Sequence, residues 1–175
     1  MEFPTIILDK ISYYLRERHE SVSVAESVTS GILQLAFSQM KSAQEFYRGG
    51  LTAYNIEQKV KHLGVDYSRA KAVNCVSRDV TEQMALGIAA LFDSDWSLAT
   101  TGYATPVEES NNEIFAYYCI AHRGIIIRSD RIELHPMTKA LDAQYYFADY
   151  ILGCLRCEVK RDQSSAVVLS HPSKP

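Results

Sequence analysis

The first part of the chain alternates between helical and extended spacing of its hydrophobic residues. Apolar side chains recur at helical intervals over residues 5–19, and the residues from Ser21 to Ala25 then change to the alternation of a strand. Helical spacing returns from Ile32 to Met40. These segments predict the order helix, strand, helix.

A segment rich in aromatic and β-favouring residues follows from Phe46 to Tyr54, and Gly49-Gly50 interrupts it. Paired glycines in a strand indicate a bend or a close approach of backbone. A short helical stretch then runs from Ile56 to Leu63, and Gly64 is a suitable residue to end it.

The second half of the chain contains stronger signals. The other predicted elements are a helix capped by Ser77, a buried strand at 96–101, hairpin strands at 114–122 and 125–132, and a final helix at 137–155. Crossover helices between strands, combined with an antiparallel hairpin, predict a three-layer α/β/α sandwich with a mixed β-sheet.

The C-terminal residues have a different composition. From Glu158 to Pro175 the sequence is charged and then rich in Ser, Lys and Pro, with one apolar island at Val167-Val168-Leu169. We therefore expect one domain at residues 1–157 and a flexible tail at 158–175.

Length and composition are typical of one globular domain: 175 residues, of which 47% are hydrophobic and 22% charged. The net charge of -3 and sequence pI near 5.9 provide no broad positive field, so we do not expect a nucleic-acid binder. The N-terminus leads into a segment broken by charges, which predicts a cytoplasmic protein without a membrane segment.

Cysteine and histidine patterns do not indicate a metal site. The four cysteines are expected to be thiols, with Cys75 and Cys119 at core or strand positions. Cys154 and Cys157 form a Cys-x-x-Cys at helical spacing, which favours a buried helix face over a redox or metal role. No histidine pair has ligand spacing and no phosphate loop is present, so neither a metal nor another cofactor is predicted.

Three residues beside predicted strand-to-helix junctions suggest hydrolytic chemistry. Ser27 ends a β-branched run just before an amphipathic stretch, where free backbone N–H groups would favour a developing oxyanion. A serine nucleophile needs a base, and a lysine supplies one when it is neutral. Lys59 is the candidate base, and the Tyr54 hydroxyl is a candidate to relay a proton or hold the lysine.

Each of these residues also has an ordinary structural interpretation. Ser27 fits a helix cap, Tyr54 a core residue and Lys59 a solvated helix position. The apolar residues of the last predicted helix likewise fit a core face or a homo-oligomer interface. The residues alone leave these alternatives open.

The segment from Ala25 to Gly31 is similar to the Ala-Glu-Ser-x-Thr-Gly-Gly motif of the CinA C-terminal domain, named after competence/damage-inducible protein A. The segment from Gly49 to Lys59 is similar to the family's Gly-Gly-x-x-x-Tyr-x-x-x-x-Lys motif. Thr101-Gly102 falls where the family's Thr-Gly-Ile-Ala-Gly-Pro loop begins. The resemblance runs from Thr5 to Leu155.

The resemblance implies a nicotinamide mononucleotide deamidase that needs no metal or cofactor and acts on a small nucleotide-like substrate. Ser27 would be the nucleophile and Lys59 the base, with Tyr54 assisting. The positions implied to bind substrate are Glu26, Thr29, Ser30, Gly31, Gly49, Gly50, Thr101, Gly102 and Thr105.

The chain also departs from the family pattern at three places. Ser30 replaces a glycine, residues 102–107 replace the glycine-rich loop, and residues 133–139 lack the family's arginine, a residue suited to an anionic ligand group. His135 and Lys139 offer charge there without the planar geometry of a guanidinium. Two alternatives therefore stand beside the deamidase: a non-catalytic relative that binds a nucleotide-like ligand or a protein, and a hydrolase shifted to another amide.

Overall fold

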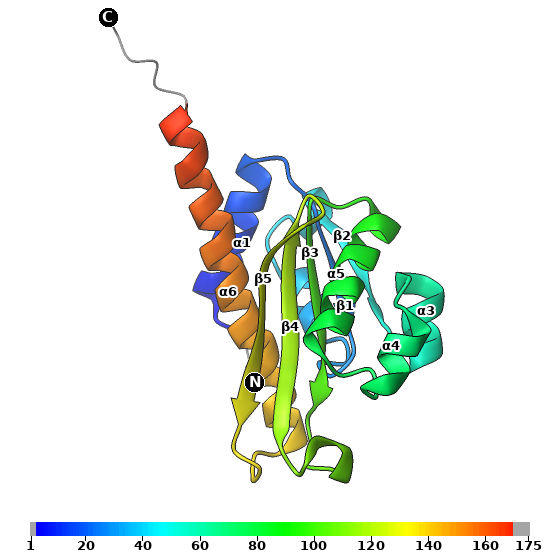
Figure 1. The fold of residues 1–175 in the computed structure, drawn as a ribbon. Helices are drawn as coiled ribbons and strands as arrows, with labels where there is room; N and C mark the ends of the chain where they lie inside the picture. Colours follow the sequence, from blue (N-terminus) through cyan, green and yellow to red (C-terminus); the bar gives the residue numbers. More distant parts are fainter. Residues whose placement is uncertain (1–2, 170–175) are drawn as a thin grey trace, which may run out of the picture.

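The computed structural model describes residues 3–169, with side chains up to Arg161, and follows the predicted alternation of helices and strands (Figure 1). The elements in chain order are α1 (Thr5–Glu17), β1 (Val22–Glu26), α2 (Ile32–Ser38), η1 (Ala43–Glu45), β2 (Tyr47–Thr52), α3 (Ile56–Leu63), α4 (Tyr67–Ala72), α5 (Arg78–Phe92), β3 (Trp96–Tyr103), η2 (Glu108–Ser110), β4 (Ile114–His122), β5 (Ile125–Leu134) and α6 (Ala140–Leu169).

The strands form one mixed sheet in the order β2-β1-β3-β4-β5. β1 is parallel to both β2 and β3, whereas β4 and β5 form an antiparallel hairpin. The ends of β1 and β2 are aligned, because Glu26 pairs with Thr52. The residues that follow β1 and β2 therefore emerge side by side, next to the last residues of β3.

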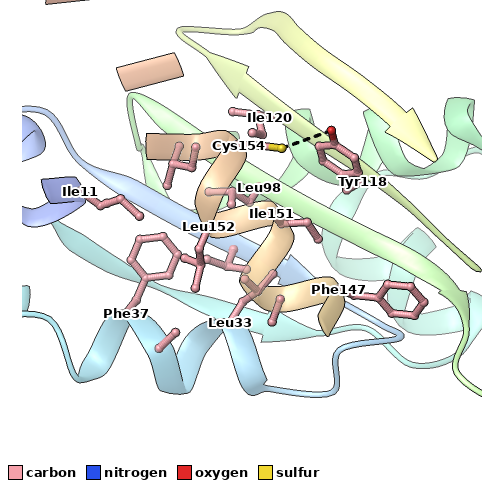
Figure 2. Close-up of a cluster of buried hydrophobic side chains, with 14 of the residues drawn as sticks. Ile11, Leu33, Phe37, Leu98, Tyr118, Ile120, Phe147, Ile151, Leu152 and Cys154 are labelled. Atoms are coloured by element: carbon pink, nitrogen blue, oxygen red, sulfur yellow. Dashed lines mark hydrogen bonds between the residues drawn. The ribbon is translucent and has the colours of Figure 1, made fainter. Parts of the chain in front are cut away.

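Helices cover both faces of the sheet, which confirms the predicted three-layer sandwich (Figure 1). On one face, α1, α2 and α6 bury a continuous apolar core against the strands. Figure 2 shows the α6 residues Phe147, Ile151 and Leu152 in this core, with Leu98 and Ile120 of the sheet. A second core lies beneath α3, α4 and α5 on the other face. Each fully buried aliphatic or aromatic side chain contributes about 1.5–3 kcal/mol.

The final helix is longer than predicted at its C-terminal end. It begins at Ala140 and continues to Leu169, so the prediction that it ends at Leu155 was wrong. Glu158 and Val159 are buried, and the Val159 carbonyl accepts a hydrogen bond from Arg18. The polar composition of residues 158–175 led to the prediction of a tail. The sequence contains no glycine or proline that would end the helix between Leu155 and Pro172.

Part of the expected tail is therefore helical, and its remaining residues, 170–175, lie outside the described residues. The side chains of the apolar island at 167–169 also lie outside them. None of the helices in the described part of the chain is both long and apolar enough to cross a membrane.

The short helix α4 was not predicted from the sequence. Ala70 is its one buried residue, so it carries almost no hydrophobic periodicity. Its start is fixed by Asp66, whose side chain accepts a hydrogen bond from the Arg69 amide at 2.8 Å. This helix leads into the segment that forms one side of the site described below.

Candidate active site

The fold brings Ser27 and Lys59 into direct contact. Ser27 follows β1, Lys59 lies in α3, and the distance from Lys59 Nζ to Ser27 Oγ is 3.0 Å. The same nitrogen donates to the Ala53 carbonyl at 2.6 Å and to the Tyr54 carbonyl at 3.4 Å. Lys59 is 1% exposed and Ser27 8% exposed, so neither is a solvated surface residue.

Burial lowers the pKa of Lys59 below its ordinary value, and the smaller electrostatic influence of Cys75 acts in the opposite direction. No carboxylate contacts the ammonium among the described residues to offset that loss of solvation. A neutral amine has two N–H bonds and one lone pair. Its two N–H bonds can serve the two carbonyls while its lone pair accepts the Ser27 hydroxyl proton, which is the arrangement a general base requires.

The amides at the start of α2 are occupied, contrary to the expectation that they would be free. The buried Glu26 carboxylate accepts hydrogen bonds from the amides of Gly31, Leu33 and Gln34 at 3.0, 3.1 and 2.8 Å. Glu26 therefore caps the helix. Ser27 does not have the capping role that was its ordinary structural interpretation. Glu26 stabilises the turn between β1 and α2 and is not among the residues that line the cavity described below.

Tyr54 contacts Lys59 through its main-chain carbonyl, and its hydroxyl makes none of the hydrogen bonds found in the described residues. Its side chain is not a core residue either, because Tyr54 is 76% exposed. Tyr54 is instead one of the residues that line the cavity in front of Ser27, which is described below. The expected role of the hydroxyl in holding the lysine therefore does not match this geometry.

A cavity of about 500 Å³ opens in front of Ser27 and Lys59. The side that carries the reactive pair, which we call the inner wall, is formed by Ser27, Val28 and Lys59. The outer wall comes from the segment after β2, the turn before α5, the end of β3 with the loop and η2 that follow it, and the start of α6; its residues are Tyr54, Asn74, Cys75, Val76, Thr101, Gly102, Tyr103, Ala104, Thr105, Val107, Glu109, Ala140 and Gln144.

Three of the expected substrate-binding residues line this cavity: Thr101, Gly102 and Thr105. Thr101 is fixed by a hydrogen bond from its hydroxyl to the Cys75 carbonyl at 3.0 Å. At Gly102 an added Cβ would lie 2.2 Å from the Phe115 carbonyl oxygen, so the glycine is required by its packing against β4.

The other expected binding residues, besides Glu26, have structural roles away from the cavity. Thr29 is buried and its hydroxyl lies 2.9 Å from that of Thr100. A Cβ at Gly49 would lie 2.8 Å from the Phe92 ring, and one at Gly50 would lie 2.8 Å from the Val24 carbonyl oxygen. The paired glycines thus allow close packing within the fold.

Ser30 and Gly31 form the left-handed turn between β1 and α2. Their φ angles are 53° and 102°, and neither residue lines the cavity. A glycine at the Ser30 position relieves a steric cost that a side chain incurs in this conformation. The departure from the family motif at Ser30 therefore affects the turn and not the cavity wall.

The segment before α5 was missed by the sequence analysis. Asn74 and Cys75 both have left-handed φ angles, 47° and 62°, and both line the cavity. The Asn74 side-chain amide donates to the Tyr103 hydroxyl at 3.0 Å. Cys75 was expected in the core or a strand; it lies in a turn, partly buried against the second core, whereas Cys119 is buried in β4 as expected. Asn74, a residue type that tolerates the left-handed conformation, was the one local signal for this turn.

All four cysteines are free thiols; Cys154 is buried on α6 and Cys157 is exposed. Among the described residues, no group of three or more His, Cys, Asp or Glu side chains is placed to hold a metal ion. His135 and Lys139, which lie in the segment where the family has its arginine, do not line the cavity. Gln144 of α6 does, and its side-chain amide donates to the Val28 carbonyl at 2.9 Å.

Several solved structures share this fold. The competence damage-inducible protein A from Klebsiella pneumoniae matches with a TM-score of 0.83 at 21% identity, over 91% of this chain and 98% of that chain. A CinA superfamily protein from Enterobacter cloacae gives a TM-score of 0.82 at 22% identity, over 91% of this chain and 94% of that chain.

Curated relatives are more similar in sequence but longer. A CinA-like protein from Picosynechococcus sp. is 36% identical over 155 residues, which are 86% of this chain and 36% of that protein. A putative competence-damage inducible protein from Streptococcus thermophilus is 27% identical over 157 residues, 89% of this chain and 37% of the relative. The chain thus spans just over a third of the length of these relatives. The family model described as the CinA C-terminal domain matches residues 5–131, so the chain belongs to the CinA family.

Proposed function

We propose that the protein is an amidohydrolase in which Ser27 attacks a carboxamide and Lys59 acts as the base. The observation that carries this proposal is the 3.0 Å contact between Lys59 Nζ and Ser27 Oγ, made by a lysine that is 1% exposed. A buried lysine without a carboxylate partner is costly to a fold, and base catalysis gives a reason to keep it.

The proposed reaction has two steps. In the first, Lys59 takes the Ser27 proton while Oγ bonds to the amide carbon, and the carbonyl becomes an oxyanion. The amide of Val28, beside the nucleophile on the inner wall, is the nearest donor in sequence for that oxyanion. The tetrahedral intermediate then collapses as Lys59 returns the proton to the leaving nitrogen, which departs as ammonia and leaves an acyl-serine.

In the second step, water attacks the acyl-serine. Lys59 takes a proton from the water and returns it to Ser27 Oγ as the acid leaves. The sum is carboxamide and water giving carboxylate and ammonium. The motif resemblance around Ser27 and Lys59 supports nicotinamide mononucleotide as the first substrate to test, with nicotinate mononucleotide as its product.

The test is ammonia release from nicotinamide mononucleotide by the wild type and by the Ser27→Ala variant. We expect the variant to lose more than about a thousandfold in turnover, because the nucleophile is removed. Ser38→Ala is the matched control, since Ser38 is an exposed serine of α2 whose hydroxyl donates to the local Leu35 carbonyl and accepts from the side chain of the neighbouring Gln39. Urea unfolding of each variant checks that the fold is retained.

Turnover that survives in Ser27→Ala contradicts the serine mechanism. A wild type that releases no ammonia from any amide of a wider panel, yet binds a ligand in the same cavity, supports the alternative of a non-catalytic relative.

A further inference from the structure

We propose that a second cavity, formed between α1 and α6, binds a small anion that carries several phosphate groups. α1 runs beside α6 (Figure 1), and a cavity of about 350 Å³ opens between them, which we call the helix cavity. The residues that line it are Lys10, Tyr14, Arg156, Cys157, Lys160 and Arg161.

The helix cavity is separate from the cavity in front of Ser27. The two have no lining residue in common. Gln144, which lines the first cavity, and Arg156 are about 18 Å apart along α6 at the rise of an α-helix. The proposal therefore goes beyond the proposed function and does not depend on it.

Positive charge is concentrated around the helix cavity. Four of its six lining residues are cationic and none is acidic, although the whole chain has a net charge of -3. Lys10, Arg156 and Lys160 make none of the ion pairs found among the side chains that the structure describes. A cavity lined by one sign of charge attracts ligands of the opposite sign.

A single carboxylate is tied to the fourth cation. Arg161 pairs with Glu158 at 3.5 Å, and Glu158 also lies 3.4 Å from Arg128 of β5. Glu158 is buried, and its one negative charge is shared between two guanidinium groups. It therefore does not neutralise the other cations of the cavity.

The arrangement of these cations disfavours the empty cavity. Arg156 and Lys160 are four residues apart on α6, a spacing at which like charges face each other and destabilise a helix. Lys10 adds a third positive charge from α1. A bound anion would remove this repulsion, so binding and the stability of the helix pair are coupled.

The types of side chain and the size of the cavity favour a compact polyphosphate. Guanidinium groups such as those of Arg156 and Arg161 match phosphate oxygens with two parallel donors, and the lysines add point charges. The volume of about 350 Å³ lies in the range of small-molecule sites. A polyphosphate places several negative charges within such a volume.

Cys157 provides a probe inside the helix cavity. It is an exposed free thiol, and the Arg156 guanidinium donates to its sulfur at 3.7 Å. Cys75 is a free thiol in the cavity in front of Ser27. The alkylation rates of these two thiols therefore report which of the two cavities an anion occupies.

The first experiment is a calorimetric titration of the purified protein with tripolyphosphate at about 0.1 M salt, where distant charges are screened. We expect saturable binding. Lys10→Gln combined with Lys160→Gln should weaken it by about tenfold, because each exposed charge contributes up to about fivefold.

Lys41→Gln combined with Lys61→Gln is the matched control. It removes the same charge from exposed positions outside the helix cavity and should change the affinity by less than about twofold. Urea unfolding of both double variants checks that the fold is retained.

The second experiment locates the anion by alkylation with neutral iodoacetamide, followed by peptide mass. Tripolyphosphate at ten times its Kd should slow alkylation of Cys157 by about tenfold, because the thiol reacts only in the empty cavity. The rate at Cys75 should not change.

The absence of saturable binding overturns the proposal, as does equal weakening in the two double variants. Protection of Cys75 in place of Cys157 also overturns it, because the anion then occupies the cavity in front of Ser27. None of these measurements uses turnover, so the failure of the proposed amidohydrolase reaction would be seen separately.

Discussion

The inner and outer walls of the cavity differ in burial and in the way their residues are held. On the inner wall, Ser27 and Lys59 are nearly inaccessible, and each is fixed by a junction between a parallel strand and a helix. On the outer wall, Tyr54 and Glu109 are exposed and belong to loops or short turns. Under the proposed function, this difference assigns the reaction to the buried inner wall and the choice of ligand to the more exposed outer wall.

The largest expected effect comes from the inner wall. Lys59→Met should lower turnover by more than about a thousandfold, because the variant has no group to take the Ser27 proton. Lys61→Met, on the exposed side of the same helix, should leave turnover unchanged. Steady-state ammonia release measures both variants.

Tyr54→Phe provides a second control for the same experiment. Because Tyr54 reaches Lys59 through its carbonyl, removal of the phenol hydroxyl should change turnover only a fewfold. A loss of turnover as large as that of Lys59→Met would mean that the Tyr54 hydroxyl takes part in proton transfer. The reaction would then depend on the outer wall as well as on the inner wall.

The next effect concerns the turn that positions Ser27. Glu26→Gln should reduce the free energy of unfolding by about 2 kcal/mol, because a charged acceptor of three amides is replaced by a neutral one. Glu57→Gln, in the exposed first turn of α3, should change it by less than about 0.5 kcal/mol. Urea titrations compare the two, and equal effects would mean that the Glu26 cap contributes little.

Stability should also depend on pH through Lys59. Burial lowers its pKa in the folded state below the unfolded value, so between these two values the unfolded chain binds more protons. Wild-type stability should therefore rise relative to Lys59→Met as the pH increases from 6 towards 10. The change is about 1.4 kcal/mol for each unit by which the pKa is lowered. Parallel urea curves across this range test the sign, and a constant difference would show that the pKa is not lowered.

The smallest effect is expected at Ser30. Ser30→Gly should stabilise the fold by less than about 1 kcal/mol, because glycine adopts a φ of 53° without the steric cost of a side chain. Ser30→Ala keeps the Cβ and should bring no such gain. Thermal unfolding separates the two variants, and equal melting temperatures would show that the turn is not strained.

The sequence predicted the strand-to-helix junctions that carry Ser27 and Lys59 because the signals for those junctions are local. Ser27 stands between a β-branched run and an amphipathic stretch, and the motifs around it and Lys59 are short and continuous. The signals for the start of α5 at Ser77 and the end of α3 at Gly64 are equally local. The Ser77 hydroxyl accepts a hydrogen bond from the Val80 amide, and Gly64 has a φ of 66°. The three-layer fold follows from the same periodicity.

The roles that could not be predicted depend on contacts between distant residues. The motif containing Glu26 did not show that its side chain turns away from the cavity to cap α2. Asn74 meets Tyr103 across 29 residues, and no spacing rule connects them. The end of α6 was misjudged because Glu158 is stabilised by Arg128 of β5, at 3.4 Å, and this partner is invisible in the composition of the tail.

The most direct test of the account is to stop the reaction with acid during turnover and locate the acyl group by peptide mass. The account predicts an adduct on the peptide that contains Ser27, absent in Ser27→Ala and in Lys59→Met. Amide turnover with the acyl group on another residue would contradict it.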